Sequence, residues 1–519
     1  MGFGFERGWG LAVFLGVAGC LVAEDRVPVD TTRGSSATQR EPEPALPVSS
    51  GVPLEPVSDS SESATPVAAN DWLVEDSMLR ALGSRDEEWS ALCAPELATD
   101  AASRRLCAAR ARLGSSWPSS FGDVLAALGL AFTSAVGNGE LGNPSFALLS
   151  HSTSLSGRVV SPINPRVFLF TNPATEGPIA GNPKPDPDMI AVAFTRGEPL
   201  VEIVARGAGG ELRFLLLRFE LACEAEAGGC SDADRFGPSI ETGWLGATPY
   251  SGEALRNTTM DCEVCHRPAG PDSPAVLRMV ERKPPWTHFF RDKEGGRLLL
   301  DDYFTAHTNA ETYGGIPGAL ITWSEPARLE GFVEHEGNAE QPVELFTMAV
   351  TRLEMRGKDP ADEPHYRQIL SDAMTGRGLP APFPATRFAD KGALARAAKA
   401  YKKVTSTGGE GELVAPSELV TPETDYALGR AVAPEASGEE VVLRACSLCH
   451  NGRLDQTLSR SRFDATRLGE MPASERERAA ERLRLPSSSP LAMPPARFVS
   501  LGDSQRERAI AALLAPAGD

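Results

Sequence analysis

The chain has 519 residues, of which 41% are hydrophobic and 23% are charged, so most of its length can contribute to a packed core. Its 51 basic and 70 acidic residues give a net charge of −19, which argues against a nucleic-acid partner, because binding to phosphates needs a basic surface. After the first 23 residues no apolar run is long enough to span a bilayer, which excludes a membrane channel or pump for most of the chain.

The first 19 residues have the organisation of a secretory signal peptide. A short segment with Arg7 precedes the apolar run 11–15, and Val17-Ala18-Gly19-Cys20 closes the segment. These four closing residues resemble the lipobox of bacterial lipoproteins. The resemblance implies cleavage before Cys20, lipid attachment to its thiol, and anchoring on the periplasmic or outer-membrane side of a bacterial envelope. The alternative is an ordinary cleaved signal peptide in which Cys20 occupies this position by chance.

The remaining chain divides by composition into successive regions. Residues 20–70 are rich in Pro, Ser, Thr and acidic residues and predict a disordered tether, because they bury too little apolar surface to fold. Residues 71–140 predict helices, and 141–250 predict a β-rich region. Within it we expect an antiparallel meander, with strands near 167–170, 190–194, 200–204 and 212–219 and a turn at Gly207 to Gly210. Residues 251–407 are mixed and mostly helical, 408–433 predict a linker, and 434–519 are again helical.

One short motif occurs twice and carries chemistry. Cys262-Glu263-Val264-Cys265-His266 and Cys446-Ser447-Leu448-Cys449-His450 both spell C-x-x-C-H, the attachment signature of c-type haem. Two cysteines three residues apart lie on one side of a helical turn, where each thiol can add to one vinyl group of the porphyrin. The adjacent histidine then serves as the proximal iron ligand. The motifs predict two covalently bound haem c groups, with His266 and His450 on the irons.

Two other interpretations of these cysteines are weaker. A zinc ion shared by both C-x-x-C pairs would bridge segments 184 residues apart, and the histidine after each pair would be accidental. A redox dithiol would call for a thioredoxin-like βαβ context, which the sequence does not indicate. The four cysteines that remain fall into two pairs close in sequence, and an oxidising compartment favours disulfides between them. The candidates are Cys93 with Cys107 and Cys223 with Cys230.

The second motif lies in a more complete pattern. A helical stretch through Val441 and Val442 leads into Cys446, and Met493 precedes a proline 43 residues after His450. The closing segment predicts a helix with a capping box at Ser504 and Glu507. Its apolar stripe consists of Ile510, Leu513 and Leu514. From about residue 434 onwards, this arrangement resembles a class I cytochrome c domain. The resemblance implies that His450 is the proximal ligand, that Met493 is the distal ligand, and that the closing helix packs on the first. Met471 also precedes a proline, but we expect it to serve packing.

The first motif lacks a Met-Pro sequence at a comparable distance. Its candidate distal ligands are His288, His307 and Met279, with an open or water-bound iron as the remaining alternative. We favour His288, which lies in the aromatic sequence 286–290. Bis-histidine ligation would lower the potential of this haem relative to the Met-bound one, so electrons would pass from the first haem to the second.

The fold class that we expect is multidomain α+β, in which the helical and β-meander region precedes two mostly α-helical, cytochrome c-like haem domains at 251–407 and 434–519. The expected function is single-electron transfer between redox partner proteins at the membrane surface, with no catalytic residues assigned. Two alternatives stay open: a dihaem peroxidase-like oxidoreductase, in which one haem reacts with a small substrate, and a surface interaction or redox-sensing module.

Overall fold

The computed structural model describes the chain in segments. These are residues 78–131, 145–149, 160, 164, 166–171, 188–267, 275, 391–406, 414, 418–419, 422, 431–447, 449–452, 462–486, 489, 491–495, 498–499 and 501–516. The expected signal peptide 1–19, Cys20, the tether 20–70 and the candidate ligands Met279, His288 and His307 lie outside these residues, as does most of the expected linker 408–433. The described residues form three hydrophobic clusters. The larger cluster and the small one on the sheet strands lie in the part named the sheet unit (described residues of 78–267 and 391–419). The third lies in the part named the C-terminal unit (described residues of 431–516).

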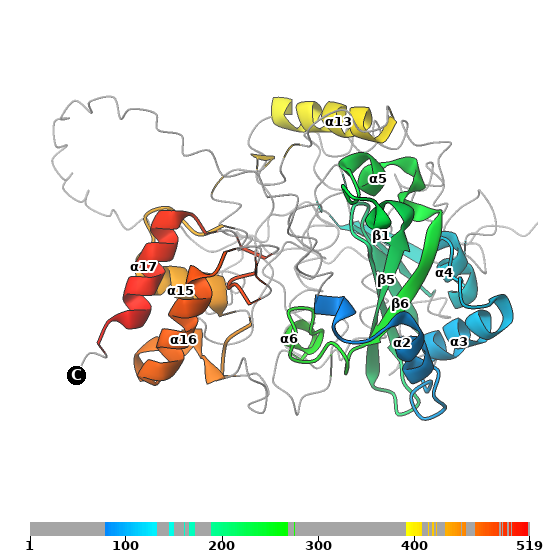
Figure 1. Cartoon of the computed structure of the whole chain (residues 1–519), viewed down its shortest axis with the longest axis horizontal. Helices are drawn as coiled ribbons and strands as arrows, with labels where there is room; N and C mark the ends of the chain where they lie inside the picture. Colours follow the sequence, from blue (N-terminus) through cyan, green and yellow to red (C-terminus); the bar gives the residue numbers. More distant parts are fainter. Residues whose placement is uncertain are drawn as a thin grey trace, which may run out of the picture. The chain divides into compact units, whose positions relative to one another are not determined.

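Three capped helices begin the sheet unit (Figure 1). Each follows a residue whose side-chain oxygen accepts a backbone N–H from the first turn, which is the usual way to satisfy a helix N-terminus. The N-cap residues are Ser84, Asp100 and Ser120, and the helices are α2 (Arg85–Leu92), α3 (Ala101–Leu113) and α4 (Phe121–Leu128). The helices expected within 71–140 are confirmed in the described part of that region.

A six-stranded antiparallel sheet follows, with its strands in chain order. The four expected strands are confirmed, and the turn between the third and fourth of them closes through a hydrogen bond from the Gly207 N–H to the Glu211 carbonyl, 2.7 Å. The sequence did not predict the two edge strands, β1 and β6. The strands are β1 (Ser145–Leu149), β2 (Arg166–Phe170), β3 (Ile190–Phe194), β4 (Leu200–Arg206), β5 (Leu212–Leu221) and β6 (Trp244–Ser251). Short helices η1 (Ala222–Ala225), α5 (Asp232–Phe236) and η2 (Pro238–Glu241) connect β5 to β6.

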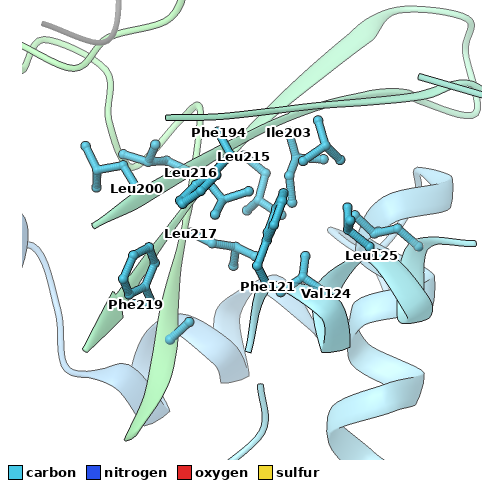
Figure 2. Packing of buried hydrophobic residues seen from close by; sticks show 14 of the residues in the cluster. Phe121, Val124, Leu125, Phe194, Leu200, Ile203, Leu215, Leu216, Leu217 and Phe219 are labelled. Carbon is cyan, nitrogen blue, oxygen red and sulfur yellow. The ribbon is translucent and has the colours of Figure 1, made fainter. Parts of the chain in front are cut away.

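The helices α2 to α4 pack on one face of the sheet. Figure 2 shows Phe121 of α4 among side chains of the strands, and its ring stacks on Phe194 of β3 with centroids 4.6 Å apart. The indole N–H of Trp89 in α2 donates to the Ala247 carbonyl of β6, 2.7 Å away. The described residues of 71–140 and 141–250 therefore share one core. The apolar faces of the helices and of the sheet are both buried because they pack against each other.

A helix from later in the chain joins this unit. α13 (Lys391–Ser406) lies beside α5 (Figure 1), and the buried Tyr401 donates its hydroxyl to Asn164 Oδ1, 3.0 Å away. Asn164 donates in turn to the Arg196 carbonyl, and the Arg196 guanidinium pairs with Glu241 at 2.6 Å with both side chains buried. Buried charges persist only when paired and hydrogen bonded, so this network ties α13 to the sheet.

The C-terminal unit consists of helices around its own cluster. α15 (Gly438–Cys446) is capped by Ser437, and it packs on α17 (Asp503–Leu514), as does α16 (Ala473–Arg484). The short η6 (Ala465–Glu470) precedes α16. None of the helices that the structure describes has the length and apolar character needed to cross a membrane.

The cap of α17 differs from the one expected. The helix begins after Gly502, whose N–H donates to Gln505 Oε1 at 3.0 Å, so the expected capping box of Ser504 and Glu507 is wrong. Both residues lie inside the helix, because the turn that precedes it ends two residues earlier than the sequence pattern indicated. Leu513 is buried as expected, whereas Leu514 is 44% exposed.

Two disulfides lie in the sheet unit. The structure joins Cys93 to Cys107 and Cys223 to Cys230, in the pairing expected from the sequence. The first links the end of α2 to α3, and the second closes the loop that follows β5. Both cross-links restrain short connections between elements that already pack on the same core.

Candidate functional site

The first C-x-x-C-H motif follows β6, an edge strand of the sheet. β6 ends at Ser251, and the next N–H, that of Gly252, donates to the Phe214 carbonyl of β5 at 2.8 Å. Leu255 is fully buried in the core of the sheet unit and its N–H donates to the Ser251 carbonyl. Strand pairing therefore fixes where the motif begins, eleven residues after the strand ends.

Asp261 prepares the turn that carries the motif. Its carboxylate is buried, and its two oxygens accept the N–H groups of Asn257 at 2.8 Å and Glu263 at 2.9 Å. The short helix α6 (Glu263–His266) then forms, with Cys262 as its N-cap residue. The His266 N–H donates to the Cys262 carbonyl at 3.0 Å, which is the hydrogen bond between residues four apart in an α-helix. The first cysteine and the histidine are therefore joined by one helical turn.

The side chains of this motif contact the sheet unit. Cys262 packs against the core of the unit, and the imidazole of His266 lies against the ring of Phe214, with centroids 4.5 Å apart and planes inclined by 34°. Phe214 lies on β5, the strand next to the edge strand β6, and precedes His266 by 52 residues. The expected haem domain 251–407 therefore does not begin as a separate body: its motif is built on β5 and β6.

The second motif forms the same kind of turn at the end of α15. The N–H groups of Cys449 and His450 both point to the Cys446 carbonyl, at 3.2 and 2.9 Å. The buried Asn451 donates its amide to the Ser447 carbonyl at 2.9 Å, and the His450 carbonyl accepts the N–H of Ala465 at 3.0 Å. These bonds hold the motif between α15 and η6.

Apolar surroundings also characterise the second motif. The rings of His450 and Phe463 meet edge to face with centroids 5.6 Å apart. Burial, with a smaller contribution from the neighbouring Cys449 thiol, raises the pKa of Cys446 to about 12. The Cys446 thiol is therefore protonated at neutral pH while it carries no attached group.

The two methionines near the second motif have different environments. Met471 packs against the cluster of the C-terminal unit, and its sulfur accepts the N–H of Asp464. Met493 is half-buried in the segment 491–495, where its N–H donates to the Arg482 carbonyl of α16 at 3.3 Å. Met471 thus has the packing role expected from the sequence.

The donor chemistry of both turns suits a covalently attached haem. Each sequence offers two cysteines and a histidine at the spacing of one turn, and each histidine has an aromatic ring beside it. Within the described parts of the chain, no three His, Cys, Asp or Glu side chains gather as a cluster that would hold a metal ion by themselves.

Sequence reasoning missed four residues that shape the two turns, namely Phe214, Asp261, Asn451 and Phe463. Asp261 immediately precedes the motif and resembles an N-cap, so a closer reading of the capping pattern would find it. No sequence pattern indicated Phe214, since its contact with His266 depends on how the strands pair. No protein-family model matches the chain, and no curated protein or solved structure matches it significantly.

Proposed function

We propose that this chain is a lipid-anchored, dihaem c-type cytochrome that passes single electrons between protein partners at the outer face of a bacterial membrane. The observation that carries the proposal is the repeated C-x-x-C-H sequence, folded both times as one turn with the histidine N–H bonded to the first cysteine's carbonyl. A haem bound at each turn would supply an iron that alternates between the ferric and ferrous states.

Each proposed haem has its own set of cysteines and iron ligands. Cys262 and Cys265 would anchor the first haem and Cys446 and Cys449 the second, with His266 and His450 as proximal ligands. Met493 is the proposed distal ligand of the second haem, and a thioether ligand raises the potential of the iron. His288 is the proposed distal ligand of the first haem.

Export to an oxidising compartment has independent support. Cys93–Cys107 and Cys223–Cys230 are disulfide bonded, and such bonds persist outside the cytoplasm, where C-x-x-C-H motifs of bacteria receive haem. Lipid on Cys20 and the tether 20–70 would keep the folded units near a membrane while they meet their partners. The net charge of −19 favours partners with basic docking surfaces.

Counting covalent haem tests this proposal. We expect the full chain, expressed with a cytochrome maturation system, to retain pigment on a denaturing gel and to contain two haems per chain by pyridine haemochrome. The double variants C262A/C265A and C446A/C449A should each lose one haem. The matched control C223A/C230A removes two cysteines of the sheet unit outside the motifs and should keep both.

Ligand-binding spectra separate an electron carrier from an enzyme. A carrier should have two six-coordinate irons that leave carbon monoxide and cyanide unbound. On the denaturing gel, a protein band without haem pigment would contradict the whole proposal. An iron that takes up these ligands, together with turnover of peroxide by a reduced donor, would replace electron transfer by peroxidase-like chemistry.

A further inference from the structure

The sheet has a second apolar face, opposite the helices α2 to α4. Side chains alternate between faces along a strand, so residues that do not face these helices point to the other side. The register of the pairs β2–β3, β3–β4 and β4–β5 places one row of these residues side by side across four neighbouring strands. The row consists of Phe170, Ala191, Val204 and Phe214, all members of one apolar cluster.

The first C-x-x-C-H motif lies at the end of this row. Phe214 is the member of the row on β5. Its carbonyl accepts the N–H of Gly252, ten residues before the motif, and its ring centroid lies 4.5 Å from that of the His266 imidazole. A Cβ atom at position 252 would come within 3.4 Å of Phe214, so the two chain segments are in close contact. The apolar face and the histidine therefore belong to one structure.

The second motif obtains its aromatic neighbour in a different way. Phe463 follows His450 by 13 residues and belongs to the same helical unit. At the first motif the neighbour comes from β5, the strand next to the edge strand β6 of the sheet. The environment of His266 is consequently set by β5 and its pairing.

We propose that the first haem is housed by the sheet unit, and that Phe214 is a positioning residue that packs on the proximal histidine His266. This inference rests on the proposed function. An imidazole turns easily about its bond to Cβ, and a ring in contact with one side restricts that rotation. The same ring keeps water from the histidine side of the haem. Outer contacts of this kind tune both the orientation of a ligand and the potential of the iron.

The test compares three variants of the full holoprotein. F214A removes the ring, F214L keeps apolar volume without an aromatic plane, and F168A removes a ring from the same cluster on β2, three strands from β5. The readouts are the two midpoint potentials, the low-spin electron paramagnetic resonance signals and the covalent haem content. C446A/C449A, which carries only the first haem, assigns the signals.

We expect F214A to keep two covalent haems, to shift the potential of the first haem in the negative direction and to change its resonance signal. Water stabilises the ferric state, which carries one more positive charge than the ferrous state. F214L should restore most of the potential, because it excludes water, but not the wild-type signal. F168A should match the wild type in both.

The outcomes distinguish the inference from the function on which it rests. Absence of covalent haem at the first motif of the wild-type chain would overturn the proposed function. Two haems in the wild type with unchanged first-haem potential and signal in F214A would overturn the role of Phe214 alone. If F214A does not fold, F214L decides: a wild-type signal in F214L would overturn the positioning role.

Discussion

Among single residues, Met493 and Met471 show how the same side chain serves different purposes. Both precede proline in the C-terminal unit. The sulfur of Met471 is occupied by the Asp464 N–H and its side chain fills the edge of the cluster. Met493 lies in a segment outside that cluster, held through its backbone to α16. The proposed distal ligation would use the Met493 thioether, which this backbone hydrogen bond does not involve.

Replacement of Met493 tests this assignment. We expect M493A to lower the potential of the second haem and to let its ferrous iron bind carbon monoxide, because the loss of a thioether ligand opens a coordination position. M471L is the control and should leave both properties as in the wild type. Spectra recorded under carbon monoxide and a redox titration measure the effect. Carbon monoxide binding by M471L and not by M493A would reverse the roles of the two residues.

The turn that each C-x-x-C-H motif forms could be predicted from sequence because its geometry is local. Cys262, His266 and their counterparts at 446 and 450 lie within one helical turn, so spacing alone places them together. Phe214 could not be predicted in this way. Its contact with His266 needs β5 to pair with β6 in one particular register, and no short-range pattern encodes that register.

At the scale of elements, Gly438 determines how closely α15 and α17 approach. A Cβ atom at this position would overlap the carbonyl oxygen of Arg508 and lie 2.8 Å from the Cβ atom of Ala512. The helix that delivers Cys446 to the second motif is therefore fixed against the closing helix through a contact that only glycine allows. The expected packing of the closing helix on the first is present in the structure.

Enlarging this residue should separate the two helices. We expect G438A to destabilise the C-terminal unit by about 1–3 kcal/mol, the usual cost of overpacking. In G469A, by contrast, the added methyl group meets nothing within 4 Å, and the variant should stay close to the wild type. Native-state hydrogen exchange of peptides from α15 and α17 reads this unit separately from the rest of the chain. Equal protection in the two variants would show that the crossing tolerates a side chain.

Elements were predictable where periodicity was strong. β2 to β5 alternate or form apolar runs bounded by turns, and all four appear near the expected residues. β6 contains Gly246 and Pro249 and pairs with β5 through a register shift at Glu220/Leu221, so its sequence does not look like a strand. The prediction of the α17 cap was wrong for a similar reason. The Gly502 N–H donates to Gln505 Oε1, and a glycine has no side chain that would indicate an N-cap in the sequence.

For the whole molecule, one hydrophobic core joins regions that differ in composition. Composition separates 71–140, 141–250 and 251–407, yet the first helices, the sheet, Cys262 and Tyr401 of α13 contribute to one core. These contacts join residues far apart in sequence, which composition does not record. The buried pair of Arg196 and Glu241 adds a polar link within the same unit, as do the hydrogen bonds that reach Tyr401.

The most direct test of the account is a spectroelectrochemical titration of the full chain, loaded with haem and kept in its oxidised disulfide form. We predict two separate one-electron transitions in the haem absorbance bands, with the first haem at the lower potential and the Met493-bound haem at the higher one. C446A/C449A should show the lower transition alone. Absorbance that stays constant across the full range of potentials would contradict the claim that this protein carries electrons.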